Sequence, residues 1–243
     1  MTTGDGSNDD FKRAMVVTAH PDDAEYGCSG SVAKWCRLGW EVVYVLCTDG
    51  SKGTEDRDIS LEQLAEIRAE EQRTAGKTLG QKTVEFLGYP DGYLEPSLDL
   101  RRDISRHIRK HKPDVLITVS PTRDLLSASY IGHPDHFAAG EAALSAVFPS
   151  ARDHLTFPEL FYDEGLEPHK VREVWVMSFG ENANFWNPLT EQDVDTSIAA
   201  LKGHVSQVSN PEEAGKWMKQ RRADIGKKIN ADYAESFHKF TLS

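Results

Sequence analysis

The chain has 243 residues, of which 39% are hydrophobic, so it can bury one sizeable core and is expected to form a single domain. Its 39 acidic residues outnumber 28 basic ones and give a formal net charge of -11, which argues against a nucleic-acid partner. The sequence contains no apolar run of about 18 residues, and its polar, acidic start differs from a secretory signal, so we expect a soluble, cytoplasmic protein without a membrane span.

Strand and helix patterns alternate along the chain. Residues 1–10, rich in Gly, Ser, Asn and Asp, predict a disordered tail, and residues 11–243 predict the folded domain. Continuous apolar runs indicate buried strands within 13–20, 41–50, 82–94, 114–121 and 171–179. Helical spacing occupies most of 29–40, 60–79, 98–111, 132–148, 190–203 and 211–229. This alternation predicts an α/β fold with a doubly wound, Rossmann-like, mostly parallel sheet and helices on both faces.

The longest predicted helix carries signals for both of its ends. Ser60 is a candidate N-cap, and Gly80 stands where a C-cap glycine belongs. Leu61, Leu64 and Ile67 mark the face that we expect to be buried.

Two short motifs combine histidine with aspartate. HPDD at residues 20–23 and HPDH at residues 133–136 each come after a predicted strand. In a doubly wound sheet, the ligand crevice lies outside the carboxyl ends of the strands, beside the first strand. We therefore expect the two motifs to be neighbours in space. Proline and aspartate also suit a turn or a helix start, but neither role explains three histidines beside the carboxylates.

Metal binding does explain these residue types. A catalytic zinc commonly takes three imidazole or carboxylate ligands and leaves one position for water. His20, Asp23 and His136 supply two nitrogens and one oxygen, so we expect one catalytic Zn2+ per chain. Iron, cobalt or manganese would suit the same ligands. Asp22 lies between the two ligands of its turn and is free to take a proton from water as a general base.

His133 has a role other than ligation in this interpretation. In its protonated form it would stabilise the oxyanion that forms on a carbonyl, or protonate the leaving group. Asp135 would hold it charged and oriented. The general acid is left open between His133 and Asp22.

At these residues the chain resembles the PIG-L/LmbE family of zinc-dependent N-acetylglucosaminyl deacetylases. The resemblance rests on AHPDDAEYGCSGSVA and GHPDH, with support from TDGSKGT, IRAEEQRTAGKTLG, LGYPDG, PDVLITVSP and YAESF, and covers most of residues 14–149. It implies the zinc ligands named above, with Asp22 as base and His133, assisted by Asp135, as the electrophilic or acid residue. It also implies removal of the acetyl group from N-acetylglucosamine units of small-molecule conjugates.

Three further residues are candidates for substrate binding. Arg68 lies in a segment similar to the Arg-x-x-Glu stretch of the family, although an exposed helix pair between Arg68 and Glu71 explains it equally well. Asp91 would bind a sugar hydroxyl, or serve only its turn. His204 falls where relatives have a similar substrate-side element, and a structural histidine is the alternative. Some members carry Glu directly after the second Asp of HPDD; here it comes one position later, so Glu25 receives no catalytic role.

The region after the fifth predicted strand is less regular. Its aromatic side chains would stack on a sugar ring or, as we expect, pack in the core: Trp175, Phe179, Phe185 and Trp186. The loop 121–131, which leads into HPDH, is long enough to form the rim of an active site.

The favoured function is a zinc-dependent hydrolase that removes the N-acetyl group from an amino-sugar conjugate. The alternatives are an amidase acting on another conjugate, of the thiol-conjugate type, and a non-catalytic metal- or sugar-binding relative. A phosphorylation-dependent receiver domain also pairs carboxylates after its first strand, but it needs a lysine after the fifth, and none closes VWVMSF. The sequence leaves open the aglycone, the metal used in the cell, homo-oligomerisation and the role of residues 170–243.

Overall fold

The computed structural model describes residues 11–125, 130–178 and 182–243, so the predicted disordered tail, 1–10, lies outside the described residues. These residues form a seven-stranded sheet in the order β3-β2-β1-β4-β5-β7-β6. The strands are β1 Arg13–Thr18, β2 Glu41–Thr48, β3 Thr83–Tyr89, β4 Val115–Thr118, β5 Glu173–Met177, β6 Phe185–Leu189 and β7 Tyr233–Thr241.

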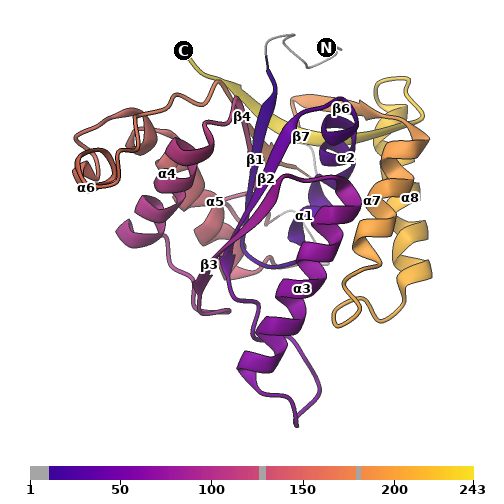
Figure 1. Ribbon diagram of the computed structural model, residues 1–243. Coiled ribbons are helices and arrows are strands. Elements are labelled where there is room, and N and C mark those ends of the chain that lie inside the picture. Colours follow the sequence, from indigo (N-terminus) through magenta and orange to yellow (C-terminus); the bar gives the residue numbers. More distant parts are fainter. Residues whose placement is uncertain (1–10, 126–129, 179–181) are drawn as a thin grey trace.

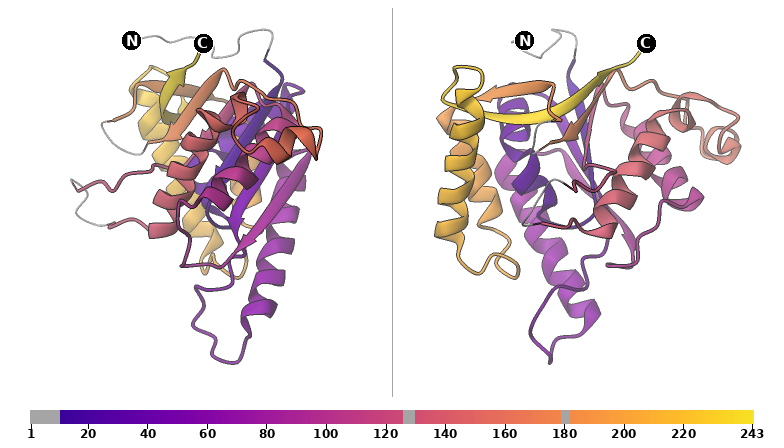
Figure 2. Two further views of the ribbon diagram at one scale, coloured as in Figure 1. Left: turned by 90° about the vertical axis from the view of Figure 1, so that its left-hand side faces the viewer. Right: turned by 180° about the vertical axis from the view of Figure 1, so that it is seen from behind.

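Helices cover both faces of the sheet. They are α1 Asp23–Gly27, α2 Ser29–Arg37, α3 Leu61–Leu79, α4 Leu98–His111, α5 Pro134–Val147, α6 Pro158–Tyr162, α7 Glu191–Leu201 and α8 Pro211–Lys227, with a 3-10 turn at Ser150–Arg152. Figure 1 shows α4, α5 and α6 on one side and α2, α3, α7 and α8 on the other, and Figure 2 shows the same layers from two further directions. The predicted doubly wound α/β architecture is confirmed.

The first strand lies at the centre of this architecture. β1 pairs in parallel with β2 on one side and with β4 on the other, and all but its first residue are buried. Burial on both faces explains the continuous apolar runs of these strands. The chain leaves β1 for β2, whereas β4 arrives on the opposite side, so the loops after β1 and β4 open at the switch point of the sheet. HPDD and HPDH lie on these two loops.

The longest helix, α3, has the predicted ends but a different buried face. Ser60 caps it through a capping box, and Gly80 ends it with a φ of 83°. Leu64 is buried, but Leu61 is 53% exposed and Ile67 42% exposed, so the predicted apolar face is wrong. The buried positions are Leu64, Arg68, Gln72, Ala75, Gly76 and Leu79. Polar side chains thus occupy the inward face, which an apolar pattern alone does not reveal.

The last third of the chain adds two strands that sequence analysis did not predict. β7 pairs antiparallel with both β5 and β6, so the sheet becomes mixed at this edge. Trp175 and Phe185 are buried with their ring centroids 4.6 Å apart, which confirms core packing for both. Trp186 is partly exposed. Phe179, the fourth aromatic residue considered, lies outside the described residues.

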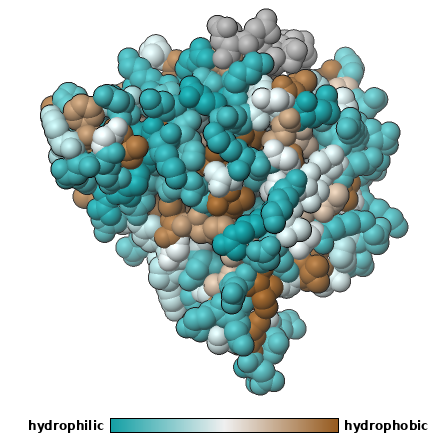
Figure 3. Space-filling model, in the orientation of Figure 1, coloured by the Kyte–Doolittle hydropathy of each residue, from teal (hydrophilic) through white to brown (hydrophobic). Residues whose placement is uncertain are grey.

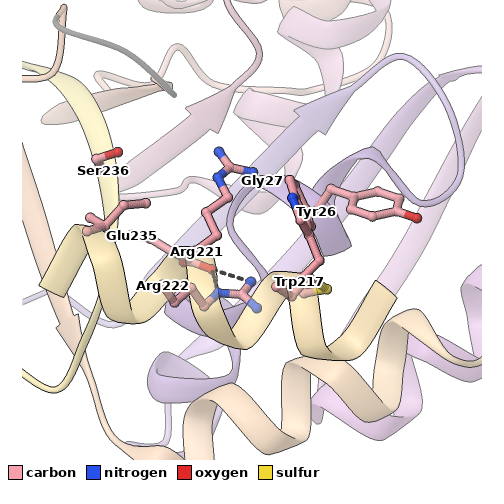
Figure 4. A pocket seen from close by; sticks show the side chains of 9 residues that line it. Tyr26, Gly27, Trp217, Arg221, Arg222, Glu235 and Ser236 are labelled. Atoms are coloured by element: carbon pink, nitrogen blue, oxygen red, sulfur yellow. Dashed lines mark hydrogen bonds and ion pairs between the residues drawn. The ribbon is translucent and has the colours of Figure 1, made fainter. Parts of the chain in front are cut away.

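A buried ion pair fastens β7 to the helices. Glu235, in the YAESF segment, accepts hydrogen bonds from the backbone N–H groups of Gly30 and Ser31 at 2.9 and 2.7 Å. It also accepts one from Nη2 of Arg222 in α8 at 2.6 Å, and both side chains are only 4% exposed. Figure 4 shows this pair lining a small pocket together with Trp217. The near-terminal motif is therefore part of the packing that joins three elements.

The outer surface agrees with the acidic composition. On the face shown in Figure 3, hydrophilic residues dominate, and hydrophobic residues form small separate groups. Within the described part of the chain, none of the helices combines the length and the apolar character needed to cross a membrane.

Candidate active site

The HPDD turn after β1 brings two of the candidate metal ligands together. α1 begins at Asp23, whose Oδ2 accepts hydrogen bonds from the backbone N–H groups of Ala19 and His20 at 3.1 and 2.9 Å. Asp22 has a φ of 92°, a backbone conformation that costs free energy for residues other than glycine. The turn leaves Nδ1 of His20 only 3.5 Å from Oδ2 of Asp23.

The HPDH motif supplies the third candidate ligand. His136 lies in the first turn of α5, and its Nε2 is 3.0 Å from Oδ1 of Asp23. Ligand atoms of His20, Asp23 and His136 all lie within 4.8 Å of one another. The structure thus brings the two motifs together where the topology predicts. Two imidazole nitrogens and one carboxylate oxygen fit a divalent transition metal such as zinc.

The charge of this cluster suits a cation. Burial alone would raise the pKa of Asp23, but the neighbouring His136 and His20 lower it well below its usual range. His20 contacts carboxylate oxygens of Asp91 at 3.1 Å and Asp135 at 3.2 Å. Burial opposes charge on His20, but these hydrogen bonds and the one with Asp23 raise its pKa to about 12. Such a concentration of carboxylates favours positive charge at this point of the molecule.

The carboxylate of Asp135 supports His20 and not His133. It is fully buried and accepts the backbone N–H groups of Gly92 at 2.7 Å and Leu94 at 3.2 Å, besides its contact with Nε2 of His20. Its Oδ1 is 3.9 Å from Nδ1 of His133, beyond hydrogen-bond distance. The expected orientation of His133 by this carboxylate is therefore not observed. Instead, the backbone N–H of Asp135 donates to Nδ1 of His133 at 3.2 Å.

Asp91 is also occupied by the protein. It is 4% exposed, and besides His20 it accepts the backbone N–H of Lys52 at 2.9 Å. Burial opposes ionisation, but the hydrogen bond with His20 lowers the pKa of Asp91 to about 2. The structure thus places the carboxylate of Asp91 against a candidate ligand, and its contact with a sugar hydroxyl stays a prediction.

Arg68 binds backbone carbonyl groups of the two loops next to the candidate ligands. Its guanidinium donates to the carbonyl oxygens of Pro21 at 2.8 Å, Gly50 at 3.0 Å and Lys52 at 3.2 Å. The side chain is buried, so the predicted exposed pair with Glu71 is wrong, whereas a substrate contact of Arg68 stays a prediction. A guanidinium carries donors on several sides, which lets one residue hold the loops after β1 and β2 together.

The candidate base lies beside the ligands and is not one of them. The backbone N–H of Asp22 donates to Oε1 of Gln72 at 3.1 Å. Oδ1 of the Asp22 carboxylate lies 3.8 Å from Nη2 of Arg68. Burial, followed by the charge of Asp23, raises the pKa of Asp22 to about 7. The two adjacent aspartates therefore have opposite shifts, one toward ionisation and one toward holding a proton.

A chain of buried polar residues continues outward from Asp22. Nε2 of Gln72 donates to Oε1 of Glu25 at 3.1 Å, and Oε2 of Glu25 lies 3.4 Å from Nε2 of His204. Gln72, Glu25 and His204 are all fully buried. The predicted substrate contact of His204 is therefore contradicted. Gln72 was missed by the sequence analysis; its signal was a polar residue four positions after Arg68 on one helix face.

His133 is the most open histidine of the cluster. Its side chain is 41% exposed, and its ring meets that of His20 edge to face with centroids 4.7 Å apart. Partial burial and the nearby His20 lower its pKa, so the charged form expected from the sequence is disfavoured. Because a backbone N–H donates to Nδ1, the proton of the neutral ring lies on Nε2.

Exposed aromatic and apolar side chains border the cluster. Tyr130 is 61% exposed with its hydroxyl 3.5 Å from Nδ1 of His136, and Ile131 is 78% exposed. Tyr93 is 75% exposed, with Nζ of Lys52 4.3 Å from its ring centroid. Part of the predicted rim loop, 126–129, lies outside the described residues.

The fold and this site define a class of α/β enzyme whose candidate metal-ligand cluster lies at the carboxyl edge of the sheet, and comparisons with known proteins agree with the fold and with a hydrolytic activity. The family model described as PIG-L, GlcNAc-PI de-N-acetylase, matches residues 15–147. Diacetylchitobiose deacetylase of Thermococcus kodakarensis is 31% identical over 198 residues, which is 82% of this chain and 71% of that protein. A probable N-acetyl-alpha-D-glucosaminyl L-malate deacetylase of Bacillus anthracis is 28% identical over 207 residues, 81% of each.

The solved structures give the same result. The N,N'-diacetylchitobiose deacetylase from Pyrococcus horikoshii, complexed with its inhibitor, superposes with a TM-score of 0.85 at 28% identity, over 96% of this chain and 85% of that one. The chain belongs to the PIG-L family. Its class of activity is the hydrolytic removal of an acyl group from an amide nitrogen.

Proposed function

We propose that this protein removes the N-acetyl group from an N-acetylglucosamine-type conjugate with the help of zinc held by His20, Asp23 and His136. The observation that carries the proposal is the meeting of these three side chains beside Asp22, a carboxylate that is not needed as a ligand. The substrate class is supported by the relatives, whose names specify deacetylation of N-acetylated sugars.

Asp22 is the general base of this proposal. A zinc ion in the cluster would supply Lewis acidity, which polarises the amide carbonyl and makes water easier to deprotonate. Asp22 takes the proton from the attacking water and passes it to the departing amine nitrogen. A pKa of about 7 suits this exchange, because a base that gains and returns a proton works best near the ambient pH.

His133 stabilises the negative charge that develops on the carbonyl oxygen. Its Nδ1 is occupied by the backbone N–H of Asp135, so Nε2–H is the group that can donate a hydrogen bond. The side chain is exposed enough to meet a substrate. A hydrogen-bond donor held in this way before the reaction contributes most when the oxyanion forms.

Asp135 and Asp91 are positioning residues for the metal ligand His20. Both contact Nε2 of His20, which leaves Nδ1 facing Asp23. A carboxylate on the second nitrogen of a ligating histidine fixes its tautomer and makes it a better ligand. Arg68 acts one step further out, by holding the backbone of the HPDD turn.

The sugar of the substrate lies against the exposed rim in this proposal. Tyr93 and Tyr130 offer ring faces next to the cluster, and the apolar faces of sugar rings pack on aromatic rings. Tyr130 is also close to His136, so a bound sugar would sit directly over the ligands.

The deciding experiment compares wild type with Asp22→Asn in zinc binding and in acetate release from a panel of N-acetylglucosamine conjugates. We expect kcat of Asp22→Asn to fall about 10^2- to 10^4-fold, the usual contribution of a general base. Zinc stoichiometry should remain one at this site, because the ligands are intact.

Asp58→Asn is the matched control, since it changes the same atoms at an exposed position that is not among the candidate ligands. Its kcat should equal that of wild type. Retained turnover in Asp22→Asn on a substrate that wild type deacetylates would refute the role of Asp22, and loss of zinc binding in His136→Ala with full activity would refute the metal assignment.

A further inference from the structure

A second group of potential metal ligands lies away from the active site, between β3 and α4. Glu85 is on β3, the edge strand of the sheet, and His107 and His111 are in the last turns of α4. α4 leads into the amino end of β4, so its last turns lie at the edge of the sheet opposite the carboxyl ends that carry HPDD and HPDH. The group is therefore independent of the proposed deacetylase site.

The three side chains already face one another. His107 and His111 are four residues apart, which places them on one face of the helix, and their rings are nearly parallel with centroids 5.9 Å apart. Nε2 of His111 is 3.1 Å from Oε1 of Glu85. One ligand atom from each of the three residues lies within 4.8 Å of the other two.

Among the described residues, the ring of His107 is not fully satisfied by hydrogen bonds. Its Nδ1 is buried and has no hydrogen-bond partner among the described residues. A buried polar atom without a partner is costly, and a metal ion is one ligand that would satisfy an imidazole nitrogen.

We propose that Glu85, His107 and His111 form a second metal site, which binds a divalent transition metal and ties the edge strand β3 to α4. Two imidazoles and one carboxylate favour Zn2+, Ni2+ or Cu2+ over Mg2+ and Ca2+, which prefer oxygen ligands. The role of such a site is structural. It would join β3, which has a sheet neighbour on only one side, to the helix layer.

Lys110 competes with a metal for this site. Its Nζ is 2.9 Å from the same Oε1 of Glu85 that contacts His111. The lysine side chain is 50% exposed, so it can move into water when an ion binds. Removal of Lys110 should therefore tighten binding, whereas removal of any of the three ligands should weaken it.

The test is a Zn2+ titration of the full-length, metal-stripped protein against a chromophoric chelator. Wild type should bind two equivalents, and His111→Ala and Glu85→Gln should each bind one with unchanged acetate release. Loss of one ligand should weaken the second site by more than the 10- to 100-fold that loss of an outer hydrogen-bond partner costs. In His136→Ala, which lacks a ligand of the first site, the second site should remain.

Three controls make the result specific. His154→Ala removes an exposed histidine that lies outside the group and should leave two equivalents. Lys110→Ala should tighten the second site about two- to fivefold, the effect of removing an exposed charge. Lys227→Ala, which removes a more exposed lysine elsewhere, should leave it unchanged.

Several results would overturn the proposal. They are a single Zn2+ equivalent in wild type, two equivalents in both His111→Ala and Glu85→Gln, and equal weakening by His154→Ala and His111→Ala, which would indicate adventitious surface binding. Because acetate release is followed separately, failure of this site and failure of the proposed deacetylase function are distinguishable.

Discussion

Gln72 offers the sharpest test of how the protein holds Asp22, the proposed general base. Its Oε1 accepts the backbone N–H of Asp22, and its Nε2 donates to Glu25. Replacement by Leu keeps most of the volume of the side chain but removes both hydrogen bonds. We expect Gln72→Leu to lower kcat while KM and zinc stoichiometry stay near the wild-type values.

The magnitude follows from the structure. Asp22 has a φ of 92°, which costs about 1–3 kcal/mol for a residue other than glycine and persists only where its surroundings enforce it. The lost hydrogen bond leaves a buried N–H unpaired, at a cost of about 1–3 kcal/mol. The turn can then relax. A displacement of the base by about 1 Å costs about 100-fold in rate, so we expect kcat to fall about 10- to 100-fold.

Steady-state kinetics of acetate release, with zinc content measured on the same samples, provides the assay. Glu70→Gln is the control, because Glu70 is on the same helix but its side chain is 63% exposed. A substitution that only destabilised the fold would lower the melting temperature without lowering kcat per folded, zinc-loaded molecule. If Gln72→Leu turned over at the wild-type rate, the positioning argument would be wrong.

Three more predictions follow from other buried groups. Asp135→Asn keeps one oxygen, which can still accept from Gly92 and His20, but removes the negative charge beside His20, so zinc affinity measured by chelator competition should fall 10- to 100-fold. Glu235→Ala leaves Arg222 buried without its partner and should lower the free energy of unfolding in urea by about 3–5 kcal/mol. For His107, burial lowers the pKa in the folded state to about 4, below the ordinary histidine value of about 6.5, so the unfolded chain takes the proton first as pH falls. Between pH 6.5 and 4, the free energy of unfolding of the metal-free wild type should therefore fall by on the order of 3 kcal/mol relative to that of His107→Gln. Urea unfolding of both proteins at several pH values measures this, and an equal pH dependence of the two free energies would contradict the prediction.

The sequence predicted the parallel half of the fold because those strands and helices carry strong local signals. The helix at 98–111 was predicted with the bounds that α4 has, and β1, β2 and β4 are continuous apolar runs. β6 and β7 were missed because their residues mix polar and apolar types. Glu235 and Asn187, for example, are buried only because partners elsewhere in the chain satisfy them.

The candidate ligands were predictable from sequence, whereas their supports were not. Histidine and aspartate in two motifs after strands point to one place once the sheet is assumed doubly wound. Arg68, Asp91 and His204 were predicted as substrate contacts from the motifs in which they lie, whereas the structure places all three in contact with other protein groups. A buried polar side chain must find its hydrogen-bond partners within the protein. Whether a residue is buried depends on the tertiary structure, which the local sequence does not reveal.

The adjacent aspartates of HPDD show how one turn gives two carboxylates different chemistry. Asp23 lies between His20 and His136, whose proximity keeps it ionised, and this is the state of a metal ligand. Asp22 is largely buried and has the negative charge of Asp23 as its neighbour, so ionisation is harder for it. Environments that push the pKa values of two neighbouring acids apart separate their roles. The left-handed backbone of Asp22 is held by its hydrogen bond to Gln72, so in the proposed mechanism Gln72 positions the base beside the candidate ligands.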